Sequence, residues 1–214
     1  MRPEIKPYGD HAVLVQWTTD GFSQAINDAV HALCANLRET GHFREVVPGY
    51  DSVVAVFDLG GMSFAEAKTT AETALRRKTV AETSTGNLID IPVNYGDEHG
   101  PDMETICAVA KLSVDEVISL HSRGTYRVCM MGFIPGFTFL SPAPEALHHP
   151  RLSTPRAKVP AGSIGIANWQ TGIYGLESPG GWQIIGRTPL SIFDATRAEP
   201  FALNAGDRVR FIPQ

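Results

Sequence analysis

The stretch of residues 132–189 limits what this chain can fold into more than any other segment. Its 58 residues hold 9 of the 20 glycines and 8 of the 15 prolines, so the backbone must turn often. They also hold 6 of the 18 aromatic residues, which a flexible linker does not need. Frequent turns together with bulky apolar side chains indicate ordered loops and short strands, which are typical of a small β-barrel or sandwich.

Local patterns predict the details of this stretch. Gly132 and Gly136 allow positive φ on either side of a rigid turn, while Phe133 and the two phenylalanines after it supply burial. The small and β-branched residues 164–167 predict a strand, and residues 178–182 predict a tight turn. Only six of the 58 residues are charged, so we expect something to cover this surface.

The first third of the chain predicts a small α/β domain. Residues 11–17 form an apolar, β-favouring run, and residues 46–48 and 52–57 flank a turn, which is a hairpin signal. Apolar residues recur at helical spacing over residues 23–40, and a capping box precedes a second helix over residues 64–78. The order βαββα is the opening of a ferredoxin-like unit.

A polar segment at residues 79–86 marks a domain boundary, so we divide the chain into domains 1–85 and 86–214. Residues 88–93 form a strand that could complete the first sheet or begin the second domain.

In the second domain, helical signals cover residues 102–111 and 113–123. Strand signals cover residues 126–131, 190–193 and 209–212. We therefore expect an α+β protein whose second domain is mostly short strands.

Composition excludes several classes of partner. A formal net charge of −5 gives no basic face for nucleic acid. No run approaches the roughly 18 apolar residues of a membrane span, and the first residues lack the apolar core of a signal peptide, so we expect a cytoplasmic protein without membrane contact. Cys34, Cys107 and Cys129 fit neither a disulfide framework nor a CxxC metal site, and we expect them to be reduced and mostly buried.

Familiar catalytic motifs are absent from the sequence. It has no GxxxxGK[ST] loop and no GxGxxG motif, so we expect a partner to bind most of any ATP that is used. There is no HExxH motif, and His99, His148 and His149 suit solvated loops better than a metal site, so we predict no metal. Ser163 lies in AGSIG, which misses the GxSxG elbow of serine hydrolases by one glycine.

What remains is a set of groups that can bind an anion within a stretch poor in charge. An arginine fork binds a carboxylate through two parallel hydrogen bonds, and neutral donors beside it can hold an amide. The alternative is that these groups only hydrogen-bond to backbone carbonyls of the loops or are ordinary solvated charges. The set comprises Arg151, Arg156, Lys158 and Arg187 with Ser163, Gln170 and Thr171.

The succession GFIPGF, PR, VPAGSIGIA, QTGIY and SPGGWQIIGRTP resembles the family of the B subunit of prokaryotic 5-oxoprolinase, which includes the kinase inhibitor KipI and is also called allophanate hydrolase subunit 1. The resemblance covers nearly the whole chain and is weakest in the first 85 residues. It implies a cyclophilin-like β-barrel that begins near residue 86. Two departures from the family pattern are Phe139 in place of Tyr and Gly175 in place of Pro, and the second reshapes a loop near the expected site.

The resemblance implies the B subunit of an ATP-dependent 5-oxoprolinase, which hydrolyses 5-oxo-L-proline to L-glutamate and is inactive without the A and C subunits. On this basis we expect a catalytic set and a set that binds substrate, and we expect Arg156→Ala to lower activity at least about tenfold without harming the fold. The catalytic set is Arg156, Gln170 and Thr171, and the substrate-binding set is Phe133, Phe137, Lys158, Ser163, Trp182 and Arg187.

Two other functions remain open from the sequence. The family also implies a KipI-like module that binds and inhibits a sporulation histidine kinase. A similar segment occurs in the carboxyltransferase part of urea carboxylase, although this chain has no biotin-acceptor Met-Lys-Met and would again need partners.

Overall fold

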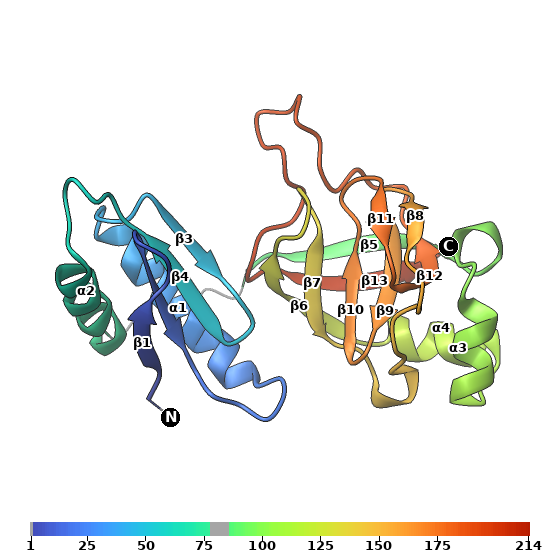
Figure 1. The fold of residues 1–214 in the computed structure, drawn as a ribbon. Coiled ribbons are helices and arrows are strands. Elements are labelled where there is room, and N and C mark those ends of the chain that lie inside the picture. The colour runs from blue at the N-terminus through green and yellow to red at the C-terminus, as the bar shows by residue number, and fades with distance from the viewer. Residues whose placement is uncertain (1, 78–85) are drawn as a thin grey trace. The chain divides into compact units, whose positions relative to one another are not determined.

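The structure is a computed structural model that describes residues 2–77 and 86–214. Contacts divide the chain into two compact units, Met1–Thr85 and Gly86–Gln214. Within the described residues, Figure 1 shows a sheet with two helices in the first unit and a barrel with two helices in the second. Each unit has a hydrophobic core of its own.

The first unit is an antiparallel sheet in the order β1-β2-β4-β3, with both helices packed against it. Residues alternate between the two faces of a strand, so Val13, Val15, Val53 and Ala55 are fully buried in one core with residues of both helices. The elements are β1 (Glu4–Pro7), β2 (Ala12–Gln16), α1 (Gln24–Glu39), β3 (Glu45–Pro48), β4 (Ser52–Val56) and α2 (Phe64–Arg76).

The predicted order from β2 to α2 is confirmed. Ser63 and Glu66 form the expected capping box, and the predicted end of this helix at Lys78 lies outside the described residues. Strand β1 was not predicted because EIKP is short and lies between prolines. It pairs with β2 at the edge of the sheet, where the last strand of a ferredoxin-like unit would lie.

The second unit is a closed barrel in the order β10-β7-β6-β13-β5-β12-β9, and β9 pairs with β10 to close it. Strands β5 and β13 are parallel, while the other neighbouring strands are antiparallel. The barrel strands are β5 (Leu88–Tyr95), β6 (Thr125–Met131), β7 (Thr138–Pro142), β9 (Ser163–Ala167), β10 (Gln170–Ile173), β12 (Gln183–Arg187) and β13 (Arg208–Pro213).

Shorter elements surround the barrel. Helices α3 and α4 contribute Met103, Ile106 and Val117 to its core. Strands β8 and β11 form a separate two-stranded sheet. These elements are η2 (Asp97–His99), α3 (Met103–Ala110), α4 (Val114–Ser122), η3 (Glu145–Leu147), β8 (Arg156–Val159) and β11 (Ser178–Gly180).

The predicted α+β class and the β-barrel are confirmed, and β5 belongs to the barrel. Two local predictions are wrong. Residues 190–193 form no strand, because this segment makes only one bridge, between Phe193 and Phe201. The segment predicted as a turn at residues 178–182 begins with strand β11, whose partner β8 supplies the hydrogen bonds.

The cysteines agree with the prediction: Cys34 and Cys129 are buried, Cys107 is half-buried, and Cys34, Cys107 and Cys129 form no disulfide. In the part of the chain that the structure describes, no helix is both long and apolar enough to cross a membrane.

Candidate functional site

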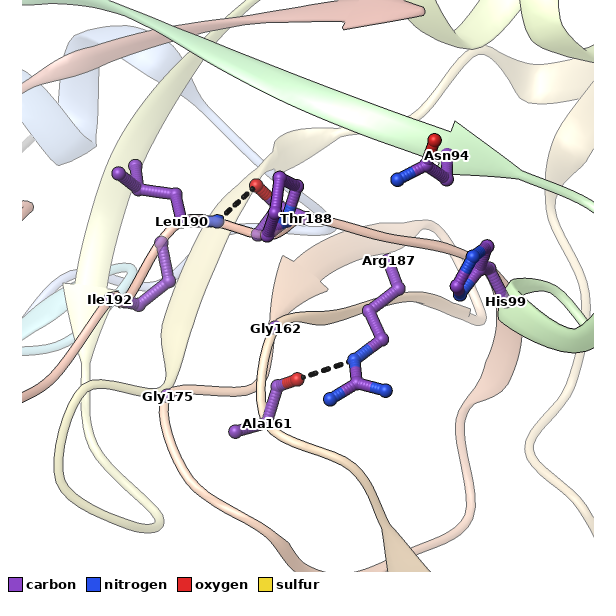
Figure 2. A pocket seen from close by; sticks show the side chains of 10 residues that line it. Asn94, His99, Ala161, Gly162, Gly175, Arg187, Thr188, Leu190 and Ile192 are labelled. Carbon is purple, nitrogen blue, oxygen red and sulfur yellow. Dashed lines mark hydrogen bonds between the residues drawn. The ribbon is translucent and has the colours of Figure 1, made fainter. Parts of the chain in front are cut away.

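A pocket of about 390 Å³ opens beside the end of β12. In Figure 2, Arg187 lies between Asn94 and His99 on one side and Leu190 and Ile192 on the other, and its guanidinium extends toward Ala161. One wall is therefore polar and the other is apolar. The lining residues are Asn94, His99, Ala161, Gly162, Gly175, Arg187, Thr188, Pro189, Leu190 and Ile192.

Strand pairing brings the polar residues together. Arg187 is the last residue of β12 and lies opposite Asn94 of β5 on one side and Ser163 of β9 on the other. Because β5 and β12 are neighbours in the barrel, residues more than 90 positions apart share one end of the pocket. Two neighbouring strands therefore position Asn94 and Arg187, while loops and the short helix η2 supply the rest of the lining.

The turn before β9 requires a glycine. Gly162 has a φ of +80°, and a Cβ there would lie 2.4 Å from the carbonyl oxygen of Thr188. The amide of Thr188 donates to the carbonyl of Gly162 at 2.9 Å, so this turn and the chain after β12 are held together. Ala161, which precedes the turn, offers its carbonyl oxygen to the pocket, where Arg187 Nε donates to it at 3.0 Å.

His99 is held at the pocket by the short helix η2. The amide of Gly96 donates to the carbonyl of Ile185 in β12 at 3.0 Å, and Gly100 donates back to Gly96 at 2.7 Å. His99 Nε2 lies 3.7 Å from Glu98 Oε1, and its Nδ1 is buried without a hydrogen-bond partner. A buried polar atom without a partner is costly, so this nitrogen lowers the stability of the fold around the pocket.

Gly175, the departure from the family pattern, also lines this pocket. A Cβ on Gly175 would lie 2.5 Å from backbone atoms of Pro135 and Gly136. The two loops approach each other too closely for a side chain at this position. The departure noted in the sequence therefore belongs to the wall of the pocket.

Among the nine predicted site residues, Arg187 alone lines the pocket. Arg156 instead donates from Nη2 to Asp102 Oδ1 at 2.6 Å, and the other oxygen of Asp102 accepts from the amide of Ile184, also at 2.6 Å. Asp102 is 5% exposed. This ion pair ties the start of α3 to β8 and β12, so we expect loss of Arg156 to destabilise the fold, contrary to the expectation from sequence.

Thr171, predicted to be catalytic, lies in the barrel interior. Its hydroxyl donates to the carbonyl of Gly165 at 3.1 Å, so its oxygen accepts the Nε2 proton of His121 at 3.0 Å. His121 is fully buried, and burial lowers its pKa to about 3. The neutral ring then accepts at Nδ1 from the Tyr95 hydroxyl at 2.8 Å. The Thr171 hydroxyl is thus fully used in holding α4 against the barrel.

The other polar candidates lie apart from the pocket lining. Lys158 is exposed and forms an ion pair with Glu177 at 3.0 Å. Gln170 is half-buried on β10, and Ser163 is buried at the start of β9 next to Arg187 in the sheet register.

The aromatic candidates divide between core and surface. Phe137 and Trp182, both predicted to bind substrate, are buried in one hydrophobic cluster with ring centroids 5.3 Å apart, so they belong to the core. Phe133 is 66% exposed, so the prediction that it supplies burial is wrong. Its own φ is +68°, whereas Gly132 lacks positive φ, and this turn points the ring outward.

Sequence reasoning missed Asn94, His99 and Thr188 as lining residues. Asn94 ends a strand and carries no motif, and His99 suited a solvated loop. Only the pairing of β5 with β12 shows that Asn94 lies beside Arg187. Among the residues that the structure describes, no group of three or more His, Cys, Asp or Glu could hold a metal ion.

Residues 3–203 match the family described as the carboxyltransferase domain, subdomain C and D. The chain belongs to this family. It is 37% identical to the B subunit of 5-oxoprolinase from Bacillus subtilis (strain 168), in an alignment that covers 99% of this chain and 93% of that protein. The resemblance seen in the sequence is confirmed.

Solved structures share the fold of this chain. The crystal structure of TTHA0988 is 32% identical with a TM-score of 0.83, and the alignment covers 95% of this chain but 40% of that one. The urea amidolyase of K. lactis has a TM-score of 0.78 at 19% identity, and the match covers 99% of this chain and 15% of that one. This second likeness shows the fold alone.

Proposed function

We propose that this chain is the B subunit of an ATP-dependent 5-oxoprolinase. The reaction adds water across the lactam C–N bond of 5-oxo-L-proline and gives L-glutamate, while ATP is cleaved. The proposal is supported by the identity to the B subunit of a 5-oxoprolinase over nearly the full length of both chains. The single structural observation that carries it is the Arg187 pocket, whose polar and apolar walls suit a small acid with an amide and a short apolar ring.

The chemistry is shared with partners in this proposal. The pocket lining offers a guanidinium, an imidazole and an amide, which bind and orient a substrate, and it includes no carboxylate or thiol. We assign the binding of ATP mainly to a partner, because one arginine suits a single carboxylate better than a triphosphate. The A and C subunits complete the site, and this chain alone is inactive.

Reconstitution tests this function. The chain is mixed with the A and C subunits, and ADP release is measured with and without 5-oxoproline. We expect activity that depends on 5-oxoproline only when all three subunits are present. Unchanged activity in a mixture that omits this chain would exclude the proposed role.

A further inference from the structure

We propose that the Arg187 pocket is the carboxylate-binding half of the substrate site and that the full chain binds a small cyclic or short-chain carboxylate there without any partner. This inference rests on the proposed function for the identity of the acid. It goes further because it assigns each wall of the pocket to a part of the ligand and makes binding a property of this chain alone.

The guanidinium of Arg187 is arranged to accept an anion. Arg187 is exposed, and its Nε donates to the carbonyl of Ala161 at 3.0 Å, which restrains the orientation of the group. Within residues 2–77 and 86–214, the two Nη groups have no hydrogen-bond acceptor. A carboxylate binds such a fork through two parallel, charge-assisted hydrogen bonds, and a guanidinium already held in place loses little freedom on binding.

A second polar contact is available on the neighbouring wall. Asn94 lies opposite Arg187 in the sheet, and His99 lines the same pocket. An amide side chain and an imidazole can together accept from an N–H and donate to a C=O. These two residues therefore suit the lactam amide of the ligand.

The remaining wall is apolar. Leu190 is half-buried and Ile192 is 1% exposed, and both lie on the side of the pocket away from His99 (Figure 2). Pro189 also lines the pocket. A volume of about 390 Å³ lies within the range of roughly 300–1,000 Å³ that is usual for small-molecule sites. The methylene groups of a five-membered ring would pack against this wall while its carboxylate meets Arg187.

Calorimetry on the full chain tests the inference with three probes: 5-oxo-L-proline, 2-pyrrolidinone, which lacks the carboxylate, and L-proline, which lacks the lactam carbonyl. We expect 5-oxo-L-proline to bind at least about tenfold more tightly than either of the others. Equal binding of 5-oxo-L-proline and 2-pyrrolidinone, or no binding of any probe, would overturn the inference.

Variants locate the binding. Arg187→Gln removes the fork, and Asn94→Asp places a negative charge opposite it, so each weakens 5-oxo-L-proline binding at least about tenfold. Arg210→Gln is the matched control, because Arg210 is an exposed arginine paired with Asp90 outside the pocket. We expect the Arg210→Gln variant to bind 5-oxo-L-proline with wild-type affinity. Wild-type affinity in the Arg187→Gln variant would overturn the inference.

The outcomes separate this inference from the proposed function. If 5-oxo-L-proline binds in a way that depends on Arg187 but the reconstituted complex shows no ADP release that depends on 5-oxoproline, the carboxylate site stands and the 5-oxoprolinase assignment fails. If the reconstituted complex is active but affinity does not depend on Arg187, the assignment stands and this inference fails.

Discussion

Replacing Arg156 with alanine tests whether this residue serves the fold. Its charge-assisted hydrogen bond reaches Asp102, whose side chain is 8% exposed, while the Arg156 side chain is 31% exposed. Asp102 would keep only the bond from the amide of Ile184. Loss of a hydrogen bond to a charged group costs about 1.5–3 kcal/mol, and breaking a fully buried ion pair costs about 3–5 kcal/mol. For this partly exposed pair we expect a loss of about 2–3 kcal/mol.

The loss is measured by urea unfolding of the full chain, monitored by tryptophan fluorescence. In thermal unfolding, the same loss would lower the melting temperature by about 6–9 °C, at roughly 3 °C per kcal/mol. Lys158→Ala is the matched control, because it removes one cation from the same strand, and its pair with Glu177 is exposed on both sides. Such surface pairs contribute about 0–1 kcal/mol. Equal losses for the two variants would refute the reasoning.

Three further predictions follow from buried or strained residues. Burial lowers the pKa of His121 to about 3, so the unfolded chain binds more protons, and the free energy of unfolding falls as the pH drops below about 6.5. Urea titrations between pH 7 and pH 5.5 should show a shallower fall for His121→Gln, and equal slopes would argue against a neutral, buried ring. Because Phe133 has positive φ, Phe133→Gly should be more stable than Phe133→Ala by about 0.5–1 kcal/mol in thermal unfolding, and the reverse order would contradict strain at this turn. Burial raises the pKa of Cys34 to about 12, so mass spectrometry should find the half-buried Cys107 alkylated first at pH 8, and early labelling of Cys34 would show that its site opens.

The sequence predicts elements that depend on short-range signals. Helix α2 begins where Ser63 and Glu66 form a capping box, and α4 begins in the same way at Ser113. The density of glycine and proline after residue 132 predicts short strands joined by turns, as in a barrel or sandwich, because turn formation is a local property, and the family resemblance narrows this to a barrel. The fold class could therefore be predicted before the structure.

The site depends on contacts between distant residues, which local patterns do not contain. In the sequence, both Arg156 and Arg187 are candidates for binding an anion. In the structure, Asp102, which lies 54 residues before Arg156, forms an ion pair with Arg156 and not with Arg187. Asn94 and His99 join Arg187 because β5 pairs with β12. Which arginine remains available to a ligand is decided by the pairing of strands.

A crystal structure of the assembled complex with 5-oxo-L-proline bound is the most direct test of this account. It should show the carboxylate oxygens of the ligand within hydrogen-bond distance of the two Nη groups of Arg187, with the ring against Leu190 and Ile192. Ligand bound at another place in the complex, with the Arg187 pocket empty, would contradict it.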